Sequence, residues 1–395
     1  MRDFRKTRTM HDKIRVLYYS PSVHFNTGSP KAMASFIESL DRTVFQPVYC
    51  AAGDGPLVEA LVVRGVEIVR GGEADCVTFR RPLAGLAAMY RQFALLRSWK
   101  IGVLHVNSFL WNTDLILAAW ALRIPVILHV HCPESVAFQN LNRFAARKVM
   151  FCSHHLMGIC GHLERIADKA EVLHNVIDTN AMSRSLSIRA ELGLNDADIA
   201  IGVVAQVLQP KGIDILIETA RLLLRERSNL VFLVAGPTPA GHEDFARRMR
   251  AAAEAPELQG RVRFLGSRSD IPNFLASLDL FLLPTRADAF PLSVIEAMAA
   301  GLPVIASKVG GIPEMISSPE IGRMVDPLTP EKFAAAIREI LALPDRGRSM
   351  GAKARLSLTG RFDIATAGER LKKIYLDVLR PRHPLIDKRF GMLEK

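Results

Sequence analysis

Two carboxylates stand on either side of a proline in the stretch ADAFPLSVIEAMAAGLPVIAS. Asp288 lies three residues before Pro291, and Glu296 lies five residues after it. Proline suits the first turn of a helix, because it needs no amide partner there and its φ angle is already helical. The spacing therefore predicts a helix that begins near Pro291, runs to Ala300 and is capped by Gly301 in the left-handed conformation.

The amino terminus of that helix has the properties of an anion-binding site. Its first amides have no partner within the helix, and the helix dipole places partial positive charge there. Since proline cannot donate, we expect the amides of Phe290, Leu292 and Ser293 to be the donors. At 1.5 Å per residue, Glu296 lies about 7.5 Å further along the axis. One extended ligand can therefore contact Asp288, the amides and Glu296 in that order.

A nucleotide sugar presents its sugar, diphosphate and nucleoside in such an order. The alternative is that both carboxylates are ordinary polar residues, with Glu296 on a solvated helix face and Asp288 in a turn. Leu292, Val294, Ile295 and Met298 surround Glu296 in the sequence. These apolar neighbours argue against a solvated Glu296. A buried carboxylate is rare without a partner, so a buried Glu296 would need one.

Apolar runs that alternate with helical patterns surround this stretch. Strands are expected at 14–19, 101–106, 126–131 and 148–153, and again at 199–205, 230–236, 262–266, 278–284 and 302–307. Such alternation indicates parallel sheets built from βαβ units. We expect an α/β protein with two doubly wound Rossmann-like domains that face a central cleft. Any ligand site should lie at the carboxyl ends of the strands.

The polar segment 186–198 separates the two series of strands. The predicted boundaries are 1–180 for the first domain, 181–366 for the second, and 367–395 for a helix with a basic tail. Packing of that helix back on the first domain is a hypothesis at this point.

The chain of 395 residues has an ordinary globular composition, with 49% hydrophobic residues, and 51 Lys and Arg exceed 40 Asp and Glu. A net charge of +11 favours anionic partners: nucleic acid, an acidic membrane surface or a phosphate-bearing substrate. Positive residues are dispersed and lack interleaved aromatic residues, which argues against nucleic acid. The segment 79–100 has the pattern of an amphipathic helix that contacts anionic lipid. A solvated face of an ordinary helix explains it equally well.

Five scattered cysteines without a C-x-x-C pair favour reduced thiols and a cytoplasmic protein, which could act at the inner face of the membrane. No signal-peptide core and no apolar run long enough to span a bilayer are expected. The stretch CSHHLMGICGH, 152–162, matches no zinc-binding spacing, so no metal is expected.

Several ordered segments resemble retaining glycosyltransferases of the GT-B fold, family four, also called glycosyltransferase group 1. The stretch 288–296 resembles the E-x7-E signature of that family, and ASLDLFLLPT, 276–285, resembles the strand before it. HNVID, 174–178, is similar to N-G-V-D, VAQVLQPKGIDILIETA, 204–220, to G-R-L-x-x-x-K-G, and VGGIPEMI, 309–316, to V-G-G-x-x-E. The resemblance covers nearly the whole chain.

This resemblance implies roles for individual residues. Glu296 is expected to bind the ribose hydroxyls, Asp288 to contact the donor sugar, and Lys211 to neutralise the diphosphate. A fixed ammonium stabilises the charge of a leaving diphosphate without a metal. His131 is expected near the donor sugar, so Asp288 and His131 are the candidate catalytic residues. His129 lies on the same face of the strand, which leaves the choice of histidine open.

The sequence departs from the family pattern at three positions. Asp288 replaces the first glutamate of the signature, Gln206 stands where arginine usually partners the lysine, and Val176 replaces the glycine of N-G-V-D. The Gln206 change removes a charge from the expected diphosphate site. It either weakens donor binding or shifts that work to Arg286 or Lys308.

The loop after the first strand is the expected acceptor-side loop, because the family places a glycine-bearing loop there. Asn26, Thr27, Gly28 and Lys31 are its candidate residues, and a polar loop before a helix that begins near Pro30 is the alternative. The loop lacks G-x-G-x-x-G, so a nicotinamide cofactor is not expected.

The expected activity is transfer of a sugar from a nucleoside diphosphate sugar to an acceptor hydroxyl, with retention at the anomeric carbon. The acceptor-side domain is the first one, and the second binds the donor. The acceptor is a saccharide or a lipid-linked molecule in polysaccharide or glycolipid assembly, and no cofactor besides the donor is required. Asp288 and Gln206 motivate an alternative, a non-catalytic or weakly active scaffold that binds nucleotide sugar. An epimerase on the same fold would need an acid and base pair, and none stands out.

Overall fold

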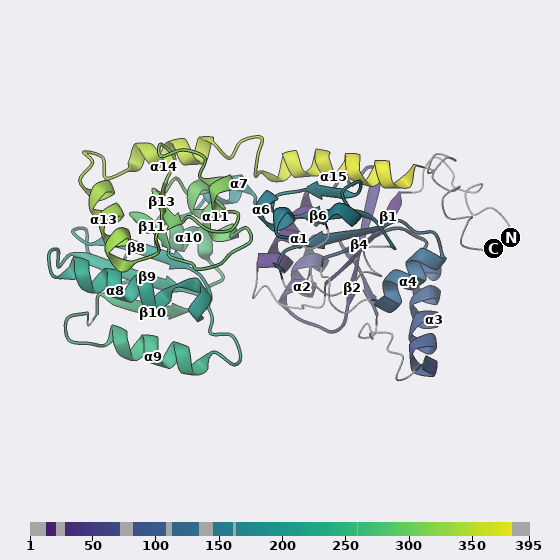
Figure 1. Ribbon diagram of the computed structural model, residues 1–395, viewed down its shortest axis with the longest axis horizontal. Coiled ribbons are helices and arrows are strands. Elements are labelled where there is room, and N and C mark those ends of the chain that lie inside the picture. Colours follow the sequence, from purple (N-terminus) through teal and green to yellow (C-terminus); the bar gives the residue numbers. More distant parts are fainter. Residues whose placement is uncertain are drawn as a thin grey trace.

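Two parallel sheets form the framework of the protein. The computed structural model describes residues 13–20, 28–71, 82–107, 113–133, 145–160, 163–258 and 260–380. Within these ranges, the strand order is β3-β2-β1-β4-β5-β6-β7 in the first sheet and β10-β9-β8-β11-β12-β13 in the second. Figure 1 shows each sheet in its own lobe with helices around it. The prediction of two doubly wound α/β units is confirmed.

The strands of the first sheet are β1 Ile14–Tyr19, β2 Phe45–Ala51, β3 Glu67–Arg70, β4 Ile101–Val106, β5 Val126–Val130, β6 Ala146–Phe151 and β7 Ala170–Val172. Those of the second are β8 Ile199–Val204, β9 Leu230–Ala235, β10 Val262–Gly266, β11 Leu280–Leu283, β12 Val304–Ser307 and β13 Arg323–Val325. The sequence did not indicate β2, β3, β7 and β13. β2 contains Pro47, which argues against a strand, and the other three have only three or four residues.

The helices beside the first sheet are α1 Gly28–Ser39, α2 Pro56–Val63, α3 Pro82–Ser98, α4 Thr113–Ala121 and α6 His154–Gly158. The later helices are α7 Thr179–Ser183, α8 Ile213–Leu224, α9 Glu243–Ala253, α10 Ile271–Ala276, α11 Leu292–Ala299, α12 Ile312–Met315, α13 Pro330–Leu341, α14 Arg348–Leu356 and α15 Ile364–Leu379. Because helices cover both faces of a parallel sheet, its central strands are apolar throughout. All six residues of β9 are fully buried.

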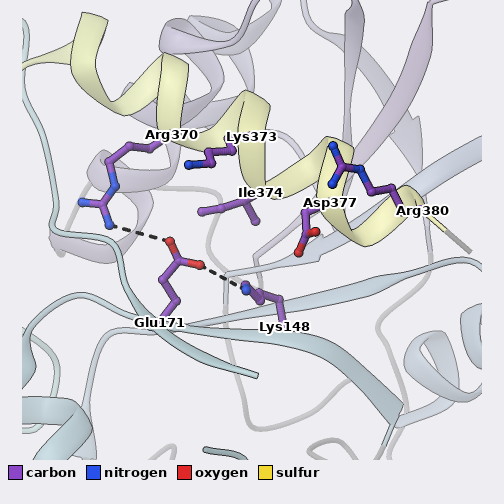
Figure 2. A pocket seen from close by; sticks show the side chains of 7 residues that line it. All are labelled: Lys148, Glu171, Arg370, Lys373, Ile374, Asp377 and Arg380. Atoms are coloured by element: carbon purple, nitrogen blue, oxygen red, sulfur yellow. Dashed lines mark ion pairs between the residues drawn. The ribbon is translucent and has the colours of Figure 1, made fainter. Parts of the chain in front are cut away.

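The last helix, α15, follows the second sheet in the chain but packs on the first. It lies against α1, where a Cβ atom on Gly368 would approach the backbone oxygen of Ser39 to 2.3 Å. In Figure 2, Glu171 lies between Lys148 and Arg370 and joins this helix to the sheet edge, at 3.3 and 3.8 Å respectively.

The two passages of the chain between the lobes lie side by side. Ile177 forms a parallel β-bridge with Asp363, and its amide donates to the carbonyl of Phe362 at 3.1 Å. The segment that leaves the first sheet is therefore hydrogen-bonded to the segment that returns to it.

A buried row of polar rings runs through the first lobe from α15. The hydroxyl of Tyr375 hydrogen-bonds with that of Tyr18 at 2.8 Å and with Nδ1 of His105 at 2.6 Å. The ring of His105 lies 5.6 Å from that of His129, which lies 4.3 Å from that of His131. Burial lowers the pKa of His105 to about 3 and that of His131 to about 4, and it also lowers the pKa of His129. All three histidines are therefore neutral at pH 7.

Replacement of Tyr375 by phenylalanine should destabilise the protein by about 1–3 kcal/mol, because it removes the partner of two buried polar groups, Tyr18 and His105. Urea denaturation followed by circular dichroism measures the change. Tyr90→Phe is the matched control, since Tyr90 is 72% exposed on α3, and its effect should stay within about 0.5 kcal/mol. Equal effects of both variants would contradict the role of the Tyr375 hydroxyl.

Stability should fall as the pH decreases from about 6.5 to about 5. In this range the unfolded histidines take up protons that the folded His105, His129 and His131 do not bind, so protonation favours the unfolded state. Urea midpoints at several pH values measure the slope.

His105→Gln should reduce that slope, because one of the buried histidines is removed. His242→Asn should leave the slope unchanged, since His242 is exposed. A flat stability profile between pH 6.5 and 5 would contradict the neutral state of the row.

Candidate active site

The candidate residues follow strands that lie at or beside the point where the strand order of each sheet reverses. In each sheet the strand order reverses beside its first strand, between β1 and β4 and between β8 and β11. Ligands of such sheets bind at the carboxyl ends of the strands at this point. Asn107 follows β4, His131 follows β5, Lys211 follows β8 and Asp288 follows β11.

The predicted helix after Asp288 is α11. Pro291 has ψ 115° and is the N-cap, so the helix begins at Leu292, directly after the proline near which its start was predicted. Among the described residues, the amides of Phe290, Leu292 and Ser293 have no hydrogen-bond acceptor. These three donors are thus available to an anion at the amino terminus.

Glu296 is only 8% exposed in the middle of α11. Within the described part of the chain, no hydrogen bond or ion pair reaches its carboxylate. The alternative of a solvated helix face is therefore wrong. The carboxylate oxygens of Glu296 are not among the fully buried unpartnered atoms of the described residues, so they stay open to a ligand that donates hydrogen bonds, such as one with vicinal hydroxyls.

Lys211 and Asp288 form an ion pair between Nζ and Oδ2, with side chains 23% and 15% exposed. Lys211 ends a short turn of 3-10 helix, Gln209–Lys211, and Gly212 follows with φ 69°. A Cβ atom on Gly212 would lie 1.8 Å from the backbone oxygen of Pro284, so only glycine fits between the turn and β11. This close approach brings the two charged side chains together.

The Gly-Gly turn after β12 packs against the loop that carries Asp288. Gly310 has φ 57°, and a Cβ atom there would lie 1.7 Å from the backbone oxygen of Asp288. The amide of Gly311 donates to that oxygen at 3.3 Å. A Cβ atom on Gly311 would lie 2.3 Å from the oxygen of Ala289. The two glycines therefore set the position of the loop before α11.

Glu314, four residues after the first glycine of the turn, joins the two lobes. Its carboxylate accepts hydrogen bonds from the amides of His154 and His155 and contacts Nε2 of His174, each at 2.8 Å. Burial raises the pKa of Glu314, but these hydrogen bonds outweigh it and the net pKa is below the ordinary range. Burial also lowers the pKa of His174. The contact is therefore a neutral histidine with a charged carboxylate at pH 7.

The segment HNVID positions the loop as well. The ring of His174 stacks on that of Phe290, with centroids 4.9 Å apart, and Phe362 packs against both rings. Nδ2 of Asn175 donates to the carbonyl of Phe290 at 3.3 Å. First-lobe side chains thus hold Phe290, whose amide is one of the predicted phosphate donors.

The candidate residues of the acceptor-side loop are only partly described. Asn26 and Thr27 lie outside the described residues. Gly28 is the first residue of α1, which therefore begins two residues before Pro30, near which its start was expected. A Cβ atom on Gly28 would lie 4.0 Å from Cδ1 of Leu292. The amino termini of α1 and α11 therefore adjoin, and the half-buried Lys31 stands in the first turn of α1.

One of the two residues proposed to substitute for the charge missing at Gln206 already has a partner. Gln206 is half-buried after β8. Arg286 already binds both carboxylate oxygens of Asp214, at 2.8 and 2.6 Å. Lys308 is exposed after β12. Of the two substitutes considered, Arg286 is thus engaged elsewhere.

The histidine and cysteine run at 152–162 does not assemble as one cluster in the described residues. Cys152 and Cys160 are buried and form no disulfide, and His162 lies outside the described residues. His154 instead lies with His174 and Glu314, whose ligand atoms are within 4.8 Å of one another. Glu314 is already hydrogen-bonded there, as described above.

Asn107, His174 and Glu314 were assigned no role from the sequence. His174 and Glu314 stand within the quoted motifs, but they contact each other across a separation of 140 residues in the sequence. Asn107 directly follows a buried strand, and this position at a strand end was the available signal.

The chain is similar to known proteins in sequence and in fold. The sequence profile for glycosyl transferases group 1 matches residues 185–357, and that for glycosyltransferase family 4 matches residues 28–181. D-inositol 3-phosphate glycosyltransferase of Segniliparus rotundus is 31% identical over 49% of this chain and 43% of its own length. Lipopolysaccharide core biosynthesis mannosyltransferase LpsB of Rhizobium meliloti is 31% identical over 48% of this chain and 54% of its own. The chain thus spans about half the length of these curated relatives.

A solved structure shares the fold. The crystal structure of Anabaena HepE in complex with UDP and glucose superposes with a TM-score of 0.75 at 20% identity, over 91% of this chain and 99% of that one. The two profiles together extend from α1 to the end of α14, and the superposition includes both sheets. The chain therefore belongs to the group 1 glycosyl transferases and has their GT-B fold.

Proposed function

We propose that the protein transfers a sugar from a nucleoside diphosphate sugar to an acceptor hydroxyl, with retention at the anomeric carbon. One observation carries the proposal: the amino termini of α1 and α11 adjoin across the two lobes, at Gly28 and Leu292. On the α11 side, three amides without an acceptor stand between the Lys211–Asp288 pair and the buried Glu296. A diphosphate fits the amides, and a ribose fits the carboxylate of Glu296.

Stabilisation of the leaving group is the main catalytic term in this proposal. Negative charge grows on the diphosphate as the glycosidic bond breaks, and fixed amides and the ammonium of Lys211 favour that charge. The acceptor hydroxyl attacks the same face of the sugar, and its proton passes to the leaving phosphate. This step uses neither a protein nucleophile nor a metal ion.

The Lys211–Asp288 pair must open when the donor binds. The ammonium then turns from the carboxylate to the diphosphate, and Asp288 becomes free to accept from the hydroxyls of the sugar. His131, after β5 of the first lobe, faces the donor sugar in this arrangement. Before the donor binds, the half-buried side chains of Lys211 and Asp288 thus neutralise each other, and the donor then replaces this ion pair.

The acceptor proposed is a saccharide or a lipid-linked molecule, bound on the first lobe in polysaccharide or glycolipid assembly. A relative named for lipopolysaccharide core biosynthesis supports this class. A cytoplasmic location at the inner face of a membrane fits such an acceptor. Among the described helices, none is both long and apolar enough to cross a bilayer.

The exposed face of α3 supports contact with an anionic membrane. Leu86 and Tyr90 are 59% and 72% exposed, and Arg91 and Arg97 are exposed on the same helix. Leu86, Tyr90 and Arg97 share one face by helical spacing. Apolar and basic side chains together favour the surface of an anionic bilayer.

A second candidate is a scaffold that binds nucleotide sugar without turnover. The Lys211–Asp288 ion pair favours it, because the site neutralises its own charge, and Gln206 supplies no further cation. Thermal stabilisation by a nucleoside diphosphate without release of diphosphate from any donor would select the scaffold.

Lys211→Ala should lower kcat by about 10²–10³-fold, because a fixed charge at the leaving group is lost. Glu296→Gln should raise KM about tenfold with a smaller change in kcat, since it weakens binding of the ribose in both the ground and transition states. Release of diphosphate from UDP-, GDP- and ADP-sugars measures both. Lys332→Ala and Glu331→Gln on the exposed start of α13 are matched controls. Unchanged turnover in both site variants would refute the assignment of the site.

Flotation with vesicles tests the membrane contact. The protein should float with phosphatidylcholine vesicles that contain phosphatidylglycerol and stay in solution without the anionic lipid. The double variant Leu86→Glu and Tyr90→Glu should lose binding, whereas Leu186→Glu should retain it. Leu186 is the matched control because it is 74% exposed after α7 and outside α3. Equal binding of all variants would show that α3 is not the contact surface.

A further inference from the structure

Asn107 links the first turn of α1 to His131. Its Nδ2 atom lies 3.0 Å from the backbone oxygen of Ser29 and 2.9 Å from the hydroxyl of Ser29. That hydroxyl donates to the backbone oxygen of Asn107 at 3.3 Å. The other side-chain atom, Oδ1, lies 2.8 Å from Nε2 of His131. Asn107 is 2% exposed, whereas Ser29 and His131 are half-buried.

The backbone oxygen of Ser29 determines which atoms donate and which accept in the contacts between Ser29, Asn107 and His131. The backbone oxygen of Ser29 can only accept, so the amide nitrogen of Asn107 must face it. The amide oxygen then faces His131 and can only accept as well. Nε2 of His131 must therefore carry the hydrogen.

We infer that Asn107, held by Ser29, is a positioning residue that fixes His131 in the Nε2–H tautomer. The lone pair of Nδ1 is then the remaining hydrogen-bonding function of the ring. Nδ1 is buried, and no group among the described residues donates to it. With the hydrogen on Nε2 engaged by Asn107, the neutral ring of His131 has no N–H left to donate to a ligand.

The charge state of His131 agrees with this geometry. Protonation would place a hydrogen on Nδ1, where the described residues offer no acceptor, and burial lowers the pKa to about 4. A neutral His131 adds no positive charge to the candidate site, where Lys211 is the cation proposed to face the diphosphate. The effect of Asn107 on turnover rests on the proposed function, whereas the tautomer itself does not.

The tautomer can be measured by NMR on the full chain labelled with ¹⁵N-histidine. Two-bond ¹⁵N–¹H correlations distinguish the two neutral tautomers from the charged ring. The signal of His131 among the 11 histidines is the one lost in His131→Gln. At pH 7 the wild-type protein should show Nε2–H for His131. The Nδ1–H form or the charged ring at this pH would overturn the inference.

Variants of Asn107 test the cause. Asn107→Ala should give a mixture of both tautomers, because the acceptor at Nε2 is lost. Asn107→Asp should raise the titration midpoint of His131 by roughly one to three pH units, since a carboxylate favours the charged ring. Asn229→Ala is the control: Asn229 also donates to a backbone carbonyl, that of Ala197 at 2.8 Å, but far from β4 in the second lobe. A pure Nε2–H signal in Asn107→Ala would overturn the role of Asn107.

Turnover provides an independent measurement. Asn107→Ala should lower kcat/KM about tenfold, the effect of one misplaced hydrogen bond. Asn107→Asp should gain activity with rising pH as His131 loses its proton, a dependence that the wild-type protein lacks. An active wild type with an unaffected Asn107→Ala would refute the positioning role. Absence of turnover with every donor, together with the expected tautomers, would instead refute only the proposed function.

Discussion

The carboxylate of Glu314 is the contact on which the candidate site depends. The site draws residues from both lobes: Gly28, Asn107 and His131 from the first, and the groups around α11 from the second. Glu314 reaches from the second lobe to two amides and His174 of the first. Because its partners are amides at a helix start and a neutral histidine, the contact is charge-assisted without a second buried charge. The relative placement of the two halves is thereby set close to the site.

Within each lobe, backbone approaches decide where side chains stand. Gly212 and Gly310 occupy places where a Cβ atom would overlap a carbonyl oxygen of the β11 region. The two approaches come from opposite sides of that region and leave Asp288 little freedom. Rigid backbone of this kind presents amides and charges in fixed directions, which suits a site that acts by electrostatic preorganisation. It also explains why a short sequence signature carries so much of the site.

The sequence predicted the central strands and the stretch around α11 well, because long apolar runs and a proline before a helix leave clear local patterns. It missed β2, whose Pro47 is unusual for a strand, and the three short strands. It placed the starts of α1 and α11 within two residues. The partners of Asn107, His174 and Glu314 could not be predicted, since they depend on contacts between segments far apart in the chain. Local pattern therefore located the site, and tertiary structure was needed to connect it.

The return of α15 to the first lobe has a consequence for how the protein can be divided. Residues 364–379 cover α1 and supply the hydroxyl that Tyr18 and His105 share. A fragment that ended before the second sheet would expose that apolar surface and leave a buried histidine without its partner. The first lobe is therefore not one continuous segment of the chain. Its last helix, α15, is synthesised only after the whole of the second lobe.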